Sequence, residues 1–116
     1  MSRSVLLQLA RDSIQEVLEA QKSIDKESLL KEHPLLNEKM NVEVKIYLKN
    51  ELKSSYKSKN DESLLTNIII SAKKSAFEDT NSSPITTAEY LSCEIELLLD
   101  TADGVLSQKD KPIVKE

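Results

Sequence analysis

Residues 41–58 read NVEVKIYLKNELKSSYKS, and this stretch decides the fold. Apolar side chains at Val42, Val44, Ile46 and Leu48 alternate with polar or charged ones, and a period of two is typical of a strand with one buried face. The alternation breaks at residues 49–51, and a weaker, more polar alternation begins at Leu52. We therefore predict a β-hairpin whose apolar face is covered by the helices expected on either side of it.

Length and composition limit the class of protein. A chain of 116 residues suits one domain, here residues 1–116. The net charge of −4 argues against a general nucleic-acid binder and against a basic membrane-surface protein. The single cysteine cannot form an internal disulfide, and no stretch approaches the roughly 18 apolar residues of a membrane span. We expect a cytoplasmic protein without a membrane segment.

Helical periodicity flanks the hairpin. Apolar residues at spacings of three and four predict one amphipathic helix over residues 4–21, capped by Ser2 or Ser4, and another from Asn60 to about Phe77. A short helix is expected over residues 26–32, and a further helical turn should begin at Thr86, which has the capping-box spacing to a glutamate.

The rest of the chain predicts one more strand. Residues 92–100 alternate again, with Cys93 in phase with the apolar positions. Residues 101–116 are polar and include a turn signal at Gly104, and we expect this segment to be a frayed tail. The predicted fold is α+β, with two main helices packed on one face of a small antiparallel or mixed sheet. The expected core consists of Leu6, Leu9, Ile14, Val17, Val44, Ile46, Leu48, Leu65, Ile68, Ile69, Ala72, Ile95 and Leu97.

The order of these features resembles the AMMECR-type domain, also called protein A of the AmmeMemoRadiSam system. Residues 75–86, SAFEDTNSSPIT, are similar to that family's AFEDPRFPPLT segment, and residues 94–96 to its LEIEV strand. The first helix carries the family's opening pattern at Leu6, Leu7, Leu9, Ala10, Arg11, Ile14 and Leu18. The resemblance runs from about Val5 to Leu99, and beside the family domain this chain looks short at its C-terminal end.

The family's most distinctive motif, LRGCIG, corresponds here to residues 52–57, LKSSYK. Leu52 is retained, Lys53 replaces arginine, Ser55 replaces the cysteine, and both glycines are lost. A serine is a far weaker nucleophile than a thiolate, and lysine lacks the bidentate fork of arginine. The resemblance implies an accessory role beside a partner, and this copy of the motif is not expected to perform the family's chemistry in the same way.

The cysteine, the histidine and the acidic residues are predicted to have structural roles. Cys93 is in phase with buried positions, and His33 lies in an irregular segment before a proline, so we expect neither a Cys–His pair nor a zinc site. Glu94 and Glu96 share a strand face about 6.6 Å apart, a spacing that suits acid–base work, but a solvated or lysine-paired face is the better interpretation. A cation site from Glu78, Asp79, Asp100 and Asp103 is weaker still, and no metal or cofactor is predicted.

Lysine is concentrated in the hairpin region. Residues 39–59 hold six lysines and two glutamates, a net charge of +4, so the rest of the chain carries −8. An anion or RNA site is one interpretation; protection of a sheet edge, or pairing with Glu94 and Glu96, is favoured. The candidate binding residues are Lys45, Lys49, Lys53, Ser55, Tyr56 and Lys57.

Three hypotheses follow for function. The first is a non-catalytic accessory or protein-binding module, whose partner would be a Memo-like or radical SAM protein or a second copy of the chain. The second is an enzyme with a diverged site around Lys53 and Ser55, with His33 as a further member. The third is an anion or RNA binder that uses the hairpin lysines, which the net charge and the scarcity of aromatic residues disfavour.

Overall fold

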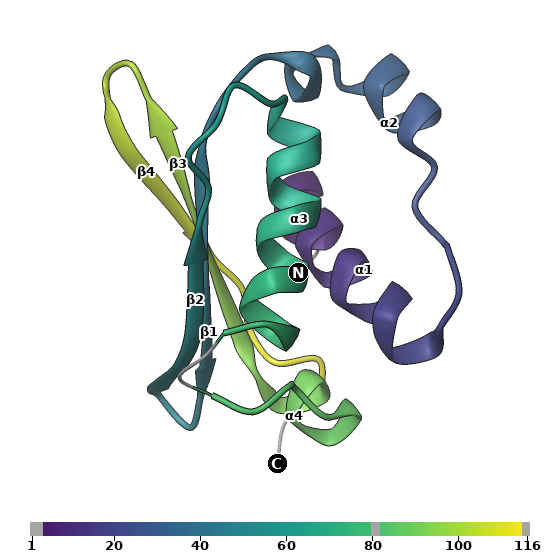
Figure 1. Cartoon of the computed structure of the whole chain (residues 1–116), viewed down its shortest axis with the longest axis vertical. Helices are drawn as coiled ribbons and strands as arrows, with labels where there is room; N and C mark the ends of the chain where they lie inside the picture. The colour runs from purple at the N-terminus through teal and green to yellow at the C-terminus, as the bar shows by residue number, and fades with distance from the viewer. Residues whose placement is uncertain (1–3, 80–81, 115–116) are drawn as a thin grey trace.

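The computed structural model describes residues 4–79 and 82–114. Helical segments and pairs of strands alternate along this part of the chain, and the strands form one four-stranded sheet (Figure 1). The elements in order are α1 (Val5–Glu19), α2 (Lys26–Glu32), the 3-10 helix η1 (Pro34–Asn37), β1 (Val42–Leu48), β2 (Glu51–Lys57), α3 (Leu64–Phe77), α4 (Thr87–Ser92), β3 (Glu94–Thr101) and β4 (Gly104–Lys109).

The sheet has the order β2-β1-β3-β4, and each neighbouring pair is antiparallel. The predicted hairpin is β1–β2; its turn residues Lys49 and Asn50 have φ of 51° and 66°, the left-handed pair that a tight hairpin turn requires. Helices α1 and α3 lie on one side of the sheet in Figure 1. No helix of the described residues covers the other side, which we call the bare face. The predicted α+β fold, with two main helices on one face of an antiparallel sheet, is confirmed.

The core lies between α1, α3 and the inner face of β1 and β3. The alternating residues of β1 and β3 are buried as expected, and α3 contributes Leu65, Ile68, Ile69 and Ala72. Leu6 and Leu48 are partly buried and pack against this core. Val17 was expected in the core but is 43% exposed, because the buried positions of α1 end at Ile14 and Val17 lies in the turn beyond them.

Helix starts depend on hydroxyl caps. The Ser4 and Thr86 hydroxyls accept hydrogen bonds from backbone N–H groups of their helices, as predicted. The second main helix begins at Leu64 behind Ser63, later than the Asn60 start that the sequence indicated. Tertiary contacts move this boundary, since the Leu64 N–H donates to the Glu38 carbonyl and residue 63 bridges to Lys39.

The C-terminal segment corrects the expectation of a frayed tail. Residues 104–109 form β4, paired with β3 from Gly104 opposite Thr101 to Lys109 opposite Glu96, while residues 115–116 lie outside the described part. Beyond β4, the Asp110 carboxylate is buried and lies 2.7 Å from the Arg11 guanidinium of α1. A buried ion pair holds the end of the sheet against the first helix. No helix in residues 4–79 and 82–114 is long and apolar enough to cross a bilayer.

Candidate functional site

The six positions that correspond to the family motif form most of edge strand β2, and they contact the segment that carries the other family-like residues. Ser54 faces α3, where its hydroxyl lies 3.4 Å from the Ser75 hydroxyl, and both side chains are buried. Tyr56, opposite Val44 in the register, also faces this side, and the Lys74 ammonium lies 5.2 Å from its ring centroid. The structure therefore brings together two stretches, 52–57 and 74–79, that are some twenty residues apart.

One outer backbone group of β2 and one of its side chains bond to residues that follow α3. The Ser55 N–H donates to the Asp79 carboxylate over 3.0 Å, and the Lys53 ammonium donates to the Ser83 carbonyl over 2.7 Å. Residues 80 and 81 of this polar loop lie outside the described part. The Lys53 ammonium and the Ser55 N–H are thus bonded to Ser83 and Asp79, and each would have to release its bond to meet a ligand. Their proposed role in binding stays a prediction.

Two other predicted binding lysines lie on the bare face of the sheet. Lys45 pairs in register with Ser55 and Glu96, and Lys57 with Glu43, so each lysine has a carboxylate residue beside it. Lys49 lies apart from them in the hairpin turn. The structure does not bring the six candidate residues into one cluster, because Tyr56 faces the helices while Lys45 and Lys57 face outward.

The charges of the bare face are mixed. The Tyr47 hydroxyl donates to Glu96 over 2.8 Å, and this bond, together with partial burial, raises the pKa of Tyr47. The Lys109 ammonium lies 4.3 Å from the Tyr47 ring centroid and 3.8 Å from the Glu94 carboxylate. Such alternation of sign favours cross-strand pairing over a continuous anion-binding surface. The lysine partner of Glu94 is thus Lys109 of β4, and not one of the hairpin lysines.

Cys93 and His33 are in separate places. Cys93 is fully buried beside Arg11, and burial raises the pKa of its thiol, which keeps it in the poorly nucleophilic protonated form. His33 lines a hollow between α1 and α2, and Figure 1 shows α2 and β2 on opposite sides of α3. His33 is therefore not placed with Lys53 and Ser55. In residues 4–79 and 82–114 no three His, Cys, Asp or Glu side chains gather as metal ligands.

The sequence reading missed two features. One is the Arg11 cluster, whose guanidinium bonds to Asp110 and to the carbonyls of Tyr90 and Cys93. A lone arginine on the apolar stripe of the first helix was the available signal, because such a charge needs a buried partner. The other is the α1–α2 hollow of about 510 Å³, which long-range geometry creates and no local pattern marks.

Comparison with known proteins places this chain in a family. The AMMECR1 family profile matches residues 7–110. A search of the curated proteins gives no match. Among solved structures, the crystal structure of the uncharacterised protein PH0010 from Pyrococcus horikoshii is similar, with a TM-score of 0.70 and 27% sequence identity.

The alignment with PH0010 covers 81% of this chain and 48% of that one, so the chain corresponds to about half of its structural neighbour. The family match spans β2, α3, α4 and β3, and it extends through β4 to the Asp110 side chain that pairs with Arg11. The resemblance inferred from the opening helix and from residues 75–86 is confirmed. The chain belongs to the AMMECR1 family.

Proposed function

We propose that this chain is a non-catalytic accessory module that binds a protein partner along edge strand β4. The observation that carries the proposal is the exposure of this strand: Val105 and Leu106 are 63% and 60% exposed, although both lie within a regular strand. Successive strand residues point to opposite faces, so apolar side chains are presented on both faces at one edge. An uncovered edge of this kind is a template for an added strand or an apolar partner surface.

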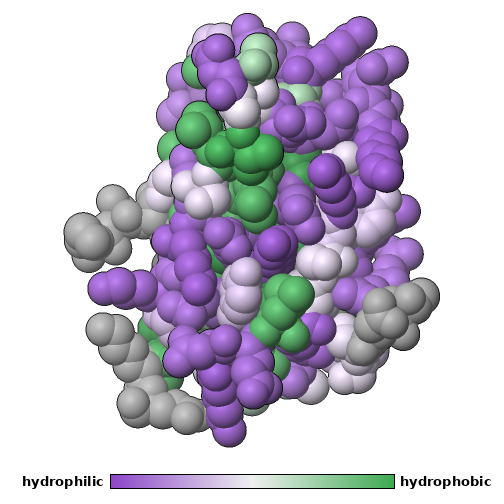
Figure 2. All heavy atoms as spheres, turned by 90° about the vertical axis from the view of Figure 1, so that its left-hand side faces the viewer, coloured by the Kyte–Doolittle hydropathy of each residue, from purple (hydrophilic) through white to green (hydrophobic). Residues whose placement is uncertain are grey.

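The two edges of the sheet differ, which supports β4 as the binding edge. At β2, Asp79 and Ser83 accept hydrogen bonds from Ser55 and Lys53, so two described residues of the chain contact that edge. At β4, the side chains are mostly exposed, and Figure 2 shows green apolar patches among purple ones on the bare face of the sheet. Leu98 of β3, which is half-buried and lies opposite Ser107 of β4, adds apolar surface to the same face.

The condition of the family motif supports a binding role over catalysis. Ser55 stands where the motif has cysteine, and its backbone N–H bonds to Asp79. Cys93, the chain's one thiol, is buried and held protonated by a raised pKa. Nucleophilic catalysis needs an accessible, activated group, and neither residue provides one.

The partner class follows from the family. We propose a Memo-like or radical SAM protein, in line with the accessory role that the resemblance implies. A second copy of this chain is the competing occupant of β4. A different protein and a second copy would each bury Val105 and Leu106, so the experiment must identify which of them is bound.

The test is affinity purification of the tagged chain from its native cells, with a β4 variant, Val105→Lys/Leu106→Lys, and a matched control on the other edge, Leu52→Lys. Leu52 is 54% exposed, so its substitution adds charge without touching β4. We expect a Memo-like or radical SAM protein to co-purify with wild type and Leu52→Lys, and to be lost with the β4 variant. Equal recovery by all three would contradict docking at β4.

The tagged chain could instead recover only its untagged copy, and size-exclusion chromatography could show a dimer that the β4 variant abolishes. These two results together would show that β4 binds a second copy of the chain and not a different protein. The enzyme alternative is tested in parallel by complementation of a deletion strain. Loss of complementation by Ser55→Ala or Lys53→Met, in variants that stay folded, would overturn the non-catalytic assignment.

A further inference from the structure

We propose that the hollow between α1 and residues 23–33 is a binding site for an aliphatic amine, an alkyl chain that ends in an ammonium group. The hollow has a volume of about 510 Å³, within the range of roughly 300–1,000 Å³ that small-molecule sites occupy. It is separate from β4 and from the family-motif strand, and none of its lining residues belongs to either. The inference therefore stands apart from the function proposed above.

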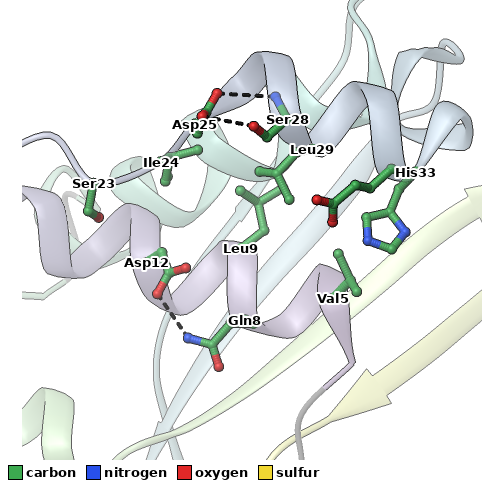
Figure 3. Close-up of a pocket in the computed structure, with 11 residues that line it drawn as sticks. Val5, Gln8, Leu9, Asp12, Ser23, Ile24, Asp25, Ser28, Leu29 and His33 are labelled. Carbon is green, nitrogen blue, oxygen red and sulfur yellow. Dashed lines mark hydrogen bonds between the residues drawn. The ribbon is translucent and has the colours of Figure 1, made fainter.

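The floor of the hollow is apolar. Val5 and Leu9 come from one side of α1, and Ile24 and Leu29 come from the segment that arches over it. Figure 3 shows Leu9 and Leu29 directed toward each other across this space. Leu9 is buried, while Ile24 and Leu29 are only partly covered and pack at the margin of the core. An alkyl chain placed here would bury apolar surface on several sides, worth about 0.8 kcal/mol per buried CH₂ group.

The acidic residues Asp12, Asp25 and Glu32 line the hollow. Among residues 4–79 and 82–114, no lysine or arginine does. His33 is the remaining ionisable residue of the lining. Carboxylates around an apolar floor favour a cation with a hydrocarbon body, and they repel a fatty acid of the same length. Charge complementarity thus selects an amine among aliphatic ligands.

Hydrogen bonds tie the start of the arch to α1 and fix the first turn of α2. The Glu16 carboxylate accepts hydrogen bonds from the Ser23 and Ile24 N–H groups, both over 2.8 Å, and so fixes the start of the arch. Asp25 caps α2 through the Ser28 N–H over 3.1 Å, and Figure 3 shows its second bond to the Ser28 hydroxyl. Helix α2 itself has no buried residue. Its inner side packs on the core only through the partly buried Leu29 and Leu30, so part of the Leu29 surface faces the hollow.

The rim carboxylates differ in how well they suit the ammonium group. Asp25 is committed to the helix cap, whereas Glu32, at the last position of α2, is exposed. Asp12 accepts one hydrogen bond, from Gln8 over 2.9 Å, and the carboxylate retains further lone pairs. We assign Glu32 as the group that meets the ammonium, with the alkyl chain along Val5, Leu9 and Leu29. Figure 3 shows Asp12 toward the opposite end of the hollow from His33, where it adds negative charge to the rim.

The test uses n-hexylammonium chloride as the probe, followed by two-dimensional NMR of the isotope-labelled chain at pH 7.5. Hexan-1-ol and sodium hexanoate have the same hydrocarbon body with no charge and with the opposite charge. We expect concentration-dependent shifts at Val5, Leu9, Ile24 and Leu29 with the amine, weaker shifts with the alcohol, and none with the carboxylate.

Matched variants locate the site. Glu32→Gln should weaken amine binding by about two- to fivefold, the usual effect of one partly exposed charge pair, and Asp12→Asn should weaken it less. Glu27→Gln, on the same helix but outside the lining, removes equal charge and should leave affinity unchanged. Val5→Phe fills the hollow and should abolish binding, whereas Val17→Phe, also exposed on α1, should not.

Each contrary result is decisive. Equal affinity for the alcohol, the amine and the carboxylate would show that the rim charges do not select the ligand. Shifts that persist in Val5→Phe, or that fall equally in Glu32→Gln and Glu27→Gln, would place the amine elsewhere. If Val5→Phe fails to fold by circular dichroism, the comparison of Glu32→Gln with Glu27→Gln decides the site alone. Absence of any shift up to about 50 mM amine, well past millimolar affinity, would overturn the proposal.

Discussion

Arg11 and Asp110, ninety-nine positions apart in the chain, form a buried ion pair in which Nε and Oδ2 are 2.7 Å apart. Their side chains are 1% and 2% exposed. The same guanidinium donates to the Tyr90 carbonyl and the Cys93 carbonyl over 2.8 Å and 2.6 Å. The Asp110 carboxylate also accepts from the Ile95 N–H over 2.7 Å. One arginine thus joins the first helix, the end of α4 and the chain after β4.

The first prediction concerns this pair. Arg11→Met leaves a buried carboxylate without its cation and should lower the free energy of unfolding by about 3–5 kcal/mol. Urea unfolding followed by circular dichroism measures the change. The control is Glu94→Gln, which removes the half-exposed Lys109 pair at 3.8 Å and should cost about 1 kcal/mol or less.

A double variant sharpens the same prediction. Arg11→Met/Asp110→Leu removes both charges, so it should be more stable than Arg11→Met alone. A cost for Arg11→Met no larger than that for Glu94→Gln would mean that the pair does not hold the C-terminal segment.

The second prediction concerns the thiol. Cys93 is fully buried and its pKa is raised chiefly by burial, so Ellman's reagent at pH 8 should react with the native chain at least about a hundredfold more slowly than with the chain in urea. The matched control is Ser55→Cys in a Cys93→Ala background, which puts a thiol back at the family position on partly exposed β2. Fast labelling of native wild type would contradict the buried assignment.

The third prediction concerns α3. The Ser71 hydroxyl is fully buried and has no hydrogen-bond partner within the described residues. Ser71→Ala removes an unsatisfied polar group and improves helix propensity, so it should raise the free energy of unfolding by about 1 kcal/mol. Ser75→Ala is the comparison one turn later, because that hydroxyl lies 3.4 Å from the Ser54 hydroxyl and its loss should not stabilise. Thermal unfolding should therefore give a higher midpoint for Ser71→Ala than for wild type, and no such increase for Ser75→Ala.

The fourth prediction concerns acid stability. Burial alone would raise the pKa of Glu16, but hydrogen bonds from the Ile24 and Ser23 N–H groups and the Lys73 ammonium outweigh it and hold this pKa below its ordinary value of 4.5. A carboxyl whose pKa is lower in the folded chain stabilises the fold above its unfolded pKa, and this stabilisation is lost as the pH falls through the folded pKa.

Glu16→Gln should therefore cost about 1–3 kcal/mol at pH 7, and the difference from wild type should shrink as the pH falls below about 4.5. Urea unfolding at pH 7, 5, 4 and 3 measures it. Glu19→Gln, an exposed residue of the same helix, should show little difference at any of these values. A pH-independent cost of Glu16→Gln would show that the charge is not what secures residues 23 and 24.

Local patterns predicted the parts of the fold that local physics determines. The alternation through Val42, Val44 and Ile46 identified β1, and the capping-box spacing identified the start of α4. The polar segment after the turn at Gly104 gave no such signal, because β4 depends on pairing with β3 and not on its own apolar face. Val17 shows the converse: its spacing is right for a buried stripe, but whether a neighbour covers that turn is decided by the rest of the chain.

The candidate sites were less accessible to sequence reasoning. The family motif could be located at residues 52–57, but the contact of Ser55 with Asp79 depends on how a loop returns to the sheet edge. The lysines could be counted, while the glutamates that alternate with them across strands required the register. The hollow at His33 arises where residues 23–33 arch over α1, and no spacing within either segment encodes it.

The unequal edges of the sheet also limit how far the molecule can assemble. β2 has Asp79 bonded to its outer backbone at Ser55, whereas no residue in 4–79 and 82–114 bonds to the outer backbone of β4. A sheet with one available edge adds strands in a single direction. If two copies joined β4 to β4, the combined sheet would end on both sides in β2 strands, each with its Ser55 N–H bonded to Asp79. That bond would disfavour the addition of a further strand, so growth would be expected to stop at the pair.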